Sequence, residues 1–244
     1  MDQAITTLQN WIDESSSIVF FGGAGVSTES GIPDFRSVDG LYSQKYDFPP
    51  ETILSHSFFV NNPGEFYKFY RDKILIKGAK PNPAHLKLAE LERAGKLKAV
   101  VTQNIDGLHQ AAGSKAVFEL HGSTLRNYCP RCGRKFPTSV IANAKGLPYC
   151  DNGDCRGIIR PDVVLYEEAL DEDVIAGAVS AIRQADMLII GGTSLVVYPA
   201  AGLINYYRGK RLVLINKSQT SADRMANLTI NAPIGEVFSQ IQVR

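Results

Sequence analysis

The stretch from Ser17 to Thr28, which reads SIVFFGGAGVST, decides the fold. Its first half, Ser17–Phe21, is rich in β-branched and aromatic residues and predicts a strand, which Gly22-Gly23 ends in a tight turn. The run Gly23–Thr28 is expected to open a helix. Glycine there would let the backbone approach a pyrophosphate, whose negative charge a helix N-terminus favours. The alternative is a tight turn of the kind found in any α/β protein.

An ordinary dehydrogenase is disfavoured by two features of this region. Thr28 stands where a dinucleotide fingerprint has Gly or Ala. That fingerprint also places an acidic residue at the end of a second strand, about 20 residues on. Asp39 and Asp47 lie nearby, but in a segment that does not resemble such a strand.

Strands and helices alternate along the rest of the chain. Ile5, Leu8, Trp11 and Ile12 fall on one face of a first helix, and a second helix runs from a cap at Asn82-Pro83 to Gly95. Further apolar strands are predicted over residues 98–102, 187–190 and 212–215. Continuous apolar strands are buried on both faces. We therefore expect an α/β fold with a doubly wound, Rossmann-like parallel sheet.

Four of the predicted strands end in small or polar residues. These ends are Gly23–Gly25, Gln103–Asp106, Gly192–Ser194 and Asn216. In an open parallel sheet, ligands bind outside the carboxyl ends of the strands. The sequence therefore predicts a binding site where these four ends meet.

Two segments interrupt the alternation and are expected to form a smaller domain. Residues 38–82 carry aromatic residues and prolines without clear strands and are expected to be a helical insertion, whereas residues 125–156 carry all the cysteines and are expected to be a zinc ribbon. Residues 1–37, 83–124 and 157–244 would then form the Rossmann-like domain.

The four cysteines form one Cys-x2-Cys pair and one Cys-x4-Cys pair. The pairs are Cys129 with Cys132 and Cys150 with Cys155, separated by residues 133–149. Two such knuckles complete a tetrahedral thiolate site for one zinc ion. Four thiolates leave no position for water, so the ion is expected to be structural. Free buried cysteines and a redox switch are the alternatives.

Composition excludes several classes of protein. The chain has 26 Lys and Arg against 25 Asp and Glu, so a net charge of +1 predicts no nucleic-acid or membrane surface. The N-terminal residues do not read as a signal peptide, and no apolar stretch reaches the roughly 18 residues of a membrane helix. The expected location is the cytoplasm, where thiols stay reduced and clustered cysteines favour metal over disulfides.

Taken together, these motifs resemble the sirtuin family, of the bacterial or archaeal type. The matching stretches occur in the family's order and are Gly23–Ser27, Gly31–Arg36, Gln103–Asp106, His121-Gly122, the four cysteines, Arg160–Val164 and Gly192–Leu195. Several independent motifs in register are far more specific than any one of them. The resemblance implies transfer of the acetyl group of a protein acetyl-lysine to the ADP-ribose of NAD, with release of nicotinamide.

The resemblance also implies roles for individual residues. His121 would be the base, because it sits in the family's His-Gly motif and a histidine pKa near about 6.5 suits that role at neutral pH. Asn104 and Asp106 would complete the catalytic set. His56, His85 and His109 lack such a context and are expected to be surface or packing residues.

The residues expected to contact the substrates follow from the same motifs. The NAD-binding residues would be Ala24, Gly25, Thr28, Ile32, Asp34, Phe35, Arg36, Gln103, Asn104, Ile105, Asp106, His121, Gly192, Thr193, Ser194, Asn216, Lys217 and Ile234. The substrate peptide would lie between Val163, Val164, Leu165 and Tyr166 on one side and Val196 and Tyr198 on the other. Such edges grip a peptide by β-augmentation; a buried strand without a ligand is the alternative.

Three departures from the family pattern bear on the substrate. Tyr166-Glu167-Glu168 stands where the family usually has Phe-Gly-Glu, which leaves peptide preference open. Gly22 replaces a threonine. The segment Leu41–Lys45 lacks the arginine with which one branch binds acidic acyl groups, so acetyl and other uncharged acyl groups are expected.

Two rival functions remain at this point. An NAD-dependent protein ADP-ribosyltransferase would use the same scaffold and cofactor site. A non-enzymatic zinc-ribbon module that binds nucleic acid is disfavoured by the near-neutral charge. The expected partners are acetylated protein lysines; a monomer fits, and the sequence does not determine the oligomeric state.

Overall fold

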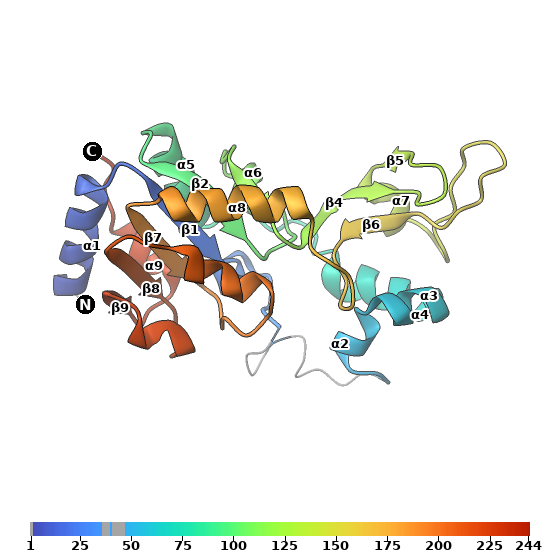
Figure 1. The fold of residues 1–244 in the computed structure, drawn as a ribbon. Helices are drawn as coiled ribbons and strands as arrows, with labels where there is room; N and C mark the ends of the chain where they lie inside the picture. The colour runs from blue at the N-terminus through green and yellow to red at the C-terminus, as the bar shows by residue number, and fades with distance from the viewer. Residues whose placement is uncertain (1, 36–39, 41–46) are drawn as a thin grey trace.

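The computed structural model describes residues 2–35, 40 and 47–244 and consists of a larger and a smaller lobe (Figure 1). The larger lobe is built on a six-stranded sheet in the order β3-β2-β1-β7-β8-β9, in which every neighbouring pair is parallel. Its strands are β1 (Ile18–Gly22), β2 (Leu97–Thr102), β3 (Val117–Glu119), β7 (Met187–Gly191), β8 (Arg211–Ile215) and β9 (Leu228–Ile230). The prediction of a doubly wound parallel sheet is confirmed.

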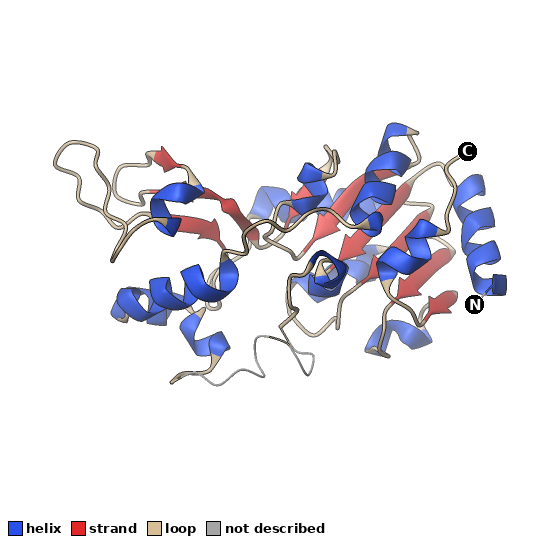
Figure 2. Cartoon of the chain, turned by 180° about the vertical axis from the view of Figure 1, so that it is seen from behind, coloured by secondary structure: helices blue, strands red, loops and turns tan. Residues whose placement is uncertain are grey.

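Helices cover both faces of this sheet (Figure 2). One face is packed by α1 (Asp2–Glu14), α5 (Pro83–Arg93) and α9 (Ile234–Ser239), and the other by α8 (Glu172–Gln184) and the 3-10 helix η5 (Ala200–Tyr206). The short helix α6 (Leu108–Ala111) follows β2, and the 3-10 helix η6 (Ser221–Arg224) precedes β9. β1 and β7 are buried along their whole length, as their apolar sequences predict.

The predicted second helix begins and ends where its sequence signals stand. The Asn82 side chain accepts a hydrogen bond from the Ala84 amide at 3.0 Å, and Pro83 occupies the first helical position. Gly95, just beyond the helix, has a φ of +75°, a conformation that glycine adopts without strain.

The expected helix after the glycine turn is wrong. Two short 3-10 turns, η1 (Ala24–Val26) and η2 (Thr28–Ser30), follow β1 instead. The cause is a tertiary contact: the Gly25 amide donates to the Gly192 carbonyl at 2.8 Å, and a Cβ on Gly25 would lie 2.8 Å from the Cα of Gly192. The backbones of the two loops are in direct contact. This contact prevents the segment after β1 from forming a regular α-helix.

The smaller lobe combines a helical segment with a three-stranded sheet. The helices are α2 (Pro50–Ile53), α3 (His56–Asn61), α4 (Pro63–Phe69) and the π-helix η4 (Tyr70–Ile74). The sheet has the order β5-β4-β6 and contains β4 (Gly122–Tyr128), β5 (Lys135–Phe136) and β6 (Arg160–Val163), with α7 (Thr138–Ala142) beside it.

The two parts of the smaller lobe share one hydrophobic core. Phe66, Tyr67 and Tyr70 from the helices pack in the same cluster as Phe136 and Ile159 from the sheet side. The Tyr67 hydroxyl also donates to the Ile159 carbonyl. The helical insertion and the cysteine-bearing segment are therefore a single packed unit.

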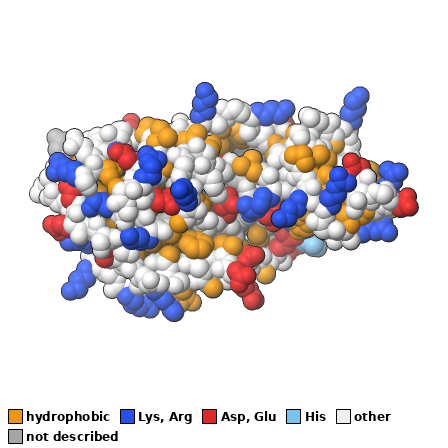
Figure 3. All heavy atoms as spheres, turned by 90° about the horizontal axis from the view of Figure 1, so that it is seen from above, with side chains coloured by type: hydrophobic (Ala, Val, Ile, Leu, Met, Phe, Trp, Pro, Cys, Tyr) orange, Lys and Arg blue, Asp and Glu red, His pale blue; other side chains and the backbone are white. Residues whose placement is uncertain are grey.

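The surface carries charges of both signs. Figure 3 shows Lys and Arg side chains interspersed with Asp and Glu over one face of the molecule. None of the helices within 2–35 and 47–244 combines the length and the apolar character that a bilayer crossing requires.

Candidate active site

A cleft of about 1230 Å³ lies between the lobes, at the carboxyl ends of β1, β2, β7 and β8. This edge is also where the strand order reverses. β2 and β3 lie on one side of β1, whereas β7, β8 and β9 lie on its other side. The cleft exceeds the roughly 300 to 1,000 Å³ of usual small-molecule sites. It therefore has room for more than one ligand.

Most residues predicted to bind NAD or peptide line this cleft. Those on its wall are Ala24, Gly25, Thr28, Ile32, Asp34, Phe35, Gln103, Asn104, Ile105, Asp106, His121, Val163, Val164, Leu165, Tyr166, Gly192, Thr193, Ser194, Tyr198, Asn216, Lys217 and Ile234. Val196 is not on the wall, and its side chain is exposed on the surface. Arg36 and the segment 41–45 lie outside the described residues.

Three polar side chains that line the cleft form a hydrogen-bonded network, in which Ser27 and Asn104 are buried and Asp106 is partly buried. The Ser27 hydroxyl donates to Asp106 Oδ2 at 2.6 Å and accepts from Asn104 Nδ2 at 3.1 Å. Asp106 Oδ1 accepts from the Leu108 amide at 2.9 Å, and the Asn104 amide donates to Thr102 Oγ1 at 3.0 Å. The ends of β1 and β2 thus hold Asn104 and Asp106 in fixed positions.

A second pair fixes the ends of β7 and β8. The Thr193 amide donates to Asn216 Oδ1 and Asn216 Nδ2 donates to the Thr193 carbonyl, both at 3.0 Å. Both side chains are less than a tenth exposed. This reciprocal pair joins two of the four strand ends that the sequence singled out.

His121 follows β3 and projects into the cleft beside Gln103. Its Nδ1 lies 3.0 Å from the Gln103 carbonyl oxygen. Because a carbonyl oxygen only accepts, Nδ1 carries the proton, and in the neutral ring Nε2 is left as a proton acceptor. Burial lowers the pKa of His121 below its usual value, against an opposing effect of the Gln103 bond. The imidazole is therefore neutral at pH 7.

The other histidines occupy packing and surface positions, as expected. His85 and His109 are buried with their ring centroids 4.7 Å apart. Burial lowers the pKa of His85 to about 4, opposed by Asp106, and the pKa of His109 to about 3, where His85 adds to the effect. His56 is a surface residue whose side chain is half exposed.

Two buried donors on the cleft wall, Gln103 Nε2 and the Tyr70 hydroxyl, have no partner among the described residues. Among the described residues, nothing accepts a hydrogen bond from Gln103 Nε2. A buried amide without a partner is costly unless a ligand or water satisfies it. This position therefore fits a polar ligand such as a ribose hydroxyl.

The wall formed by Val163–Tyr166 connects the two parts of the smaller lobe. Val163 pairs with Gly122 in the small sheet, and the Val164 amide donates to the His121 carbonyl at 3.0 Å. The Tyr166 amide donates to the Leu54 carbonyl, also at 3.0 Å. Across the cleft, Tyr198 is 72% exposed, which leaves its ring free to contact a bound chain.

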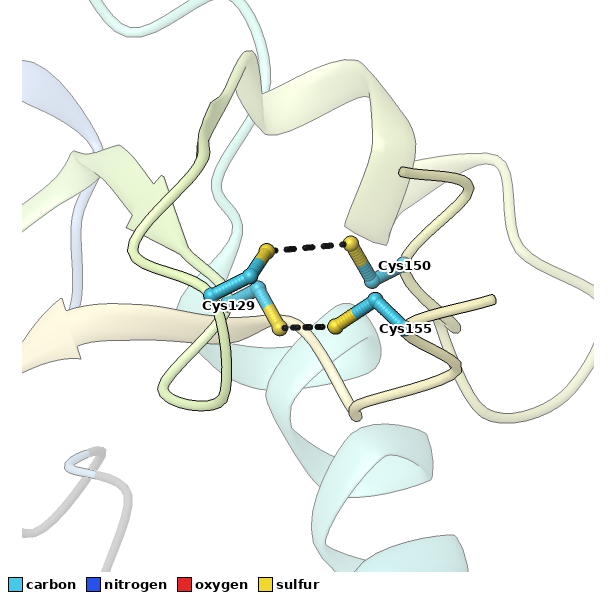
Figure 4. Close-up of side chains that lie close together, drawn as sticks. Cys129, Cys150 and Cys155 are labelled. Atoms are coloured by element: carbon cyan, nitrogen blue, oxygen red, sulfur yellow. Dashed lines mark hydrogen bonds between the residues drawn. The ribbon is translucent and has the colours of Figure 1, made fainter. Parts of the chain in front are cut away.

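The four cysteine sulfurs converge on one point. All four Sγ atoms lie within 4.8 Å of one another, with Cys129 3.6 Å from Cys155 and Cys132 3.7 Å from Cys150. Figure 4 shows the sulfurs of Cys129, Cys150 and Cys155 directed toward one another. These separations are too long for disulfides. They match the roughly 3.8 Å between thiolates on a tetrahedral zinc ion.

The sequence interpretation missed some residues of the cleft. The motif Gly23–Ser27 assigns no role to Ser27, although a hydroxyl two residues after Gly25 is a signal in the sequence that indicates one. The segment 73–79 also lines the cleft, and nothing in its sequence pointed to this. Its position follows from how the helical segment packs on the small sheet.

Comparisons with known proteins agree on one family. The model of the Sir2 family matches residues 23–199. An NAD-dependent protein deacetylase of Clostridium perfringens is 62% identical over 244 residues, covering 99% of both chains, and one of Clostridium acetobutylicum is 59% identical over 97% of both.

Solved structures give the same result. A structure described as "Sir2-p53 peptide-NAD+" is 40% identical, with a TM-score of 0.86 over 97% of this chain and 96% of that one. Another, "Sir2 bound to acetylated peptide", has the same identity, coverage and TM-score.

Proposed function

This chain belongs to the Sir2 family, and we propose that the cleft between its lobes is the active site of an NAD-dependent protein deacetylase in which His121 is the general base. The protein transfers the acetyl group of an acetyl-lysine to ADP-ribose and releases nicotinamide. The observation that carries the assignment of His121 is its hydrogen bond to the Gln103 carbonyl, which leaves Nε2 as an acceptor within the cleft.

Residues from four strand ends would hold NAD. Ala24 and Gly25 present backbone close to the cleft and suit the pyrophosphate, while Asn216 and Thr193 suit a ribose at the other end. When bound, NAD supplies an electrophilic ribose carbon and a hydroxyl that a base can activate. Asn104 and Asp106, fixed by Ser27, would orient that ribose toward His121. The same set includes Thr28, Ile32, Asp34, Phe35, Arg36, Gln103, Ile105, Gly192, Ser194, Lys217 and Ile234.

Acetylated protein substrates would bind as an added strand. Val163–Tyr166 would contact one edge of the peptide and Val196 and Tyr198 the other. Backbone pairing of this kind gives only a weak preference for particular peptide sequences. The acyl groups expected are acetyl and other uncharged ones.

The cysteine cluster binds one structural zinc ion. Four thiolates complete a tetrahedral shell and leave no position at which water could be activated. We place the protein in the cytoplasm, because clustered reduced thiols suit a compartment in which disulfides do not persist.

Substitution of His121 is the direct test of the base. His121→Ala should reduce deacetylation of an acetyl-peptide by at least about a hundredfold, because no other described side chain occupies its position beside Gln103. NAD binding, measured by calorimetry, should persist. Near-normal turnover by this variant would remove His121 from the base role.

Product analysis separates the deacetylase from an ADP-ribosyltransferase. A panel of acetyl-, propionyl- and succinyl-peptides with NAD should yield O-acyl-ADP-ribose and nicotinamide by mass spectrometry, with the uncharged acyl groups removed fastest. ADP-ribosylated protein without deacylation would favour the rival activity. Faster removal of succinyl than of acetyl would contradict the acyl preference.

A further inference from the structure

The turn that closes the proposed peptide wall contains an unusual residue. Glu167 has a φ of +76°, in the left-handed region that glycine normally occupies, and it stands where the family pattern has glycine. A glutamate there costs roughly 1 kcal/mol or more in backbone strain. Such a residue persists only when its surroundings hold it.

Ser57, on the neighbouring helix α3, holds the Glu167 side chain in place. The Ser57 amide donates to Glu167 Oε2 at 2.9 Å, and the Ser57 hydroxyl donates to Glu167 Oε1 at 3.0 Å. Two hydrogen bonds to one carboxylate fix its position at the edge of the cleft. Each oxygen accepts only one of them and keeps further acceptor capacity.

The two glutamates of this turn, Glu167 and Glu168, differ in whether a cationic side chain pairs with them. Glu168 accepts hydrogen bonds from Nη1 and Nη2 of Arg160, at 2.7 and 2.9 Å, and also contacts His56 Nδ1 at 2.8 Å. Glu167 lines the cleft and is exposed, and within the described part of the chain no Lys, Arg or His pairs with it. Among the residues that the structure describes, its carboxylate thus carries no cationic partner and faces the cleft, where a bound ligand can meet it.

We propose that Glu167 is a specificity-determining residue that favours peptides with a basic side chain next to the acyl-lysine. This inference rests on the proposed peptide wall, because Glu167 directly follows Tyr166 on it. A lysine or arginine beside the acyl-lysine would meet a fixed carboxylate with which no described cation pairs, whereas an acidic side chain would be repelled by it. Backbone pairing alone supplies no such preference.

The test compares acetyl-lysine peptides that differ at one position, with Arg, Ala or Glu placed on either side of the acetyl-lysine. For the unaltered enzyme, the Arg peptide should exceed the Glu peptide in kcat/KM by about twofold to fivefold at low salt, as exposed charge pairs give. The ratio should shrink at high ionic strength. Glu167→Gln should bring it close to one, and Glu167→Lys should reverse it.

Glu172→Gln is the matched control. Glu172 is an exposed acidic residue at the start of α8 that does not line the cleft, so the ratio should stay as in the unaltered enzyme. An unchanged ratio in Glu167→Gln, at both positions, overturns the inference.

Peptide binding gives a readout that does not depend on turnover. Fluorescence anisotropy with the same labelled peptides should give the same order of affinities. If no peptide were deacetylated, the proposed function would fail, while the anisotropy ratio would still decide the role of Glu167.

Discussion

Ser27 holds the two side chains on which the proposed chemistry depends. It donates to Asp106 and accepts from Asn104, and its own side chain is 1% exposed. Buried polar groups of this kind are valuable only when all of them are satisfied. The role of Ser27 is therefore that of a positioning residue rather than a catalytic one.

Ser27→Ala should remove the hydroxyl to which both Asn104 Nδ2 and Asp106 Oδ2 are hydrogen-bonded. We expect kcat/KM for an acetyl-peptide to fall about tenfold to a hundredfold, which corresponds to about 1.4 to 2.7 kcal/mol. Circular dichroism should stay unchanged. Ser139→Ala, at an exposed position on α7, is the control and should behave as the unaltered enzyme. Equal activity of both variants would contradict the role of the network.

The pH dependence of turnover tests the protonation state of His121. Burial lowers its pKa, so the base form persists to a lower pH than it would for an exposed histidine. The acid limb of kcat/KM for deacetylation should therefore lie below about pH 6.5. A limb centred above pH 7 would show that the group is not a buried neutral imidazole.

At the scale of elements, the small lobe depends on how closely its loops approach the cysteines. A Cβ on Gly157 would lie 2.7 Å from Cys129 Sγ and 3.0 Å from the Cβ of Arg131. Gly157 therefore allows the Cys150–Cys155 loop to pack against the Cys129–Cys132 knuckle. Zinc binding and folding are coupled in such a unit.

Gly157→Ala should weaken zinc binding without removing a ligand. Overpacking of about 1 to 3 kcal/mol predicts at least a fivefold loss of affinity, measured by competition with a chromogenic chelator. Gly146→Ala, where no described residue other than the chain neighbours lies within 4 Å of the added methyl group, should retain zinc. Cys129→Ala and Cys155→Ala should lose zinc and solubility together. A stable, zinc-free and active variant would show that the ion is dispensable.

At the scale of the whole molecule, the buried pair of His85 and His109 makes the fold sensitive to acid. Both pKa values are lowered, to about 4 and about 3, chiefly by burial. The unfolded chain binds more protons than the native one below the usual histidine pKa, so stability falls as pH drops below about 6.5. Each histidine contributes up to about 1.4 kcal/mol per pH unit until its folded pKa is reached.

His109→Leu should make stability depend less steeply on pH. Its free energy of unfolding, measured in urea at pH 7.5, 5.5 and 4.5, should fall less steeply with acidification than that of the unaltered protein. The expected difference is about 1 kcal/mol per pH unit between pH 6 and 4. Parallel slopes would show that His109 does not titrate on unfolding.

Local sequence determined the elements and the metal site of this protein. The runs at 18–22 and 187–191 form strands because unbroken apolar residues favour strands that are covered on both faces. Asn82-Pro83 begins α5 because capping depends on neighbours within one turn. The cysteine spacing indicated zinc because each knuckle is a local chelate.

Only the tertiary structure decided how distant segments meet. The contact between Gly25 and Gly192 replaced the expected helix with 3-10 turns, and the bond between Ser57 and Glu167 stabilised a left-handed glutamate. Likewise, the segment 73–79 reaches the cleft through packing of the smaller lobe. These features join residues far apart in the chain. Their energies depend on packing that no local pattern of residues encodes, which is why sequence motifs located the cleft but not its full lining.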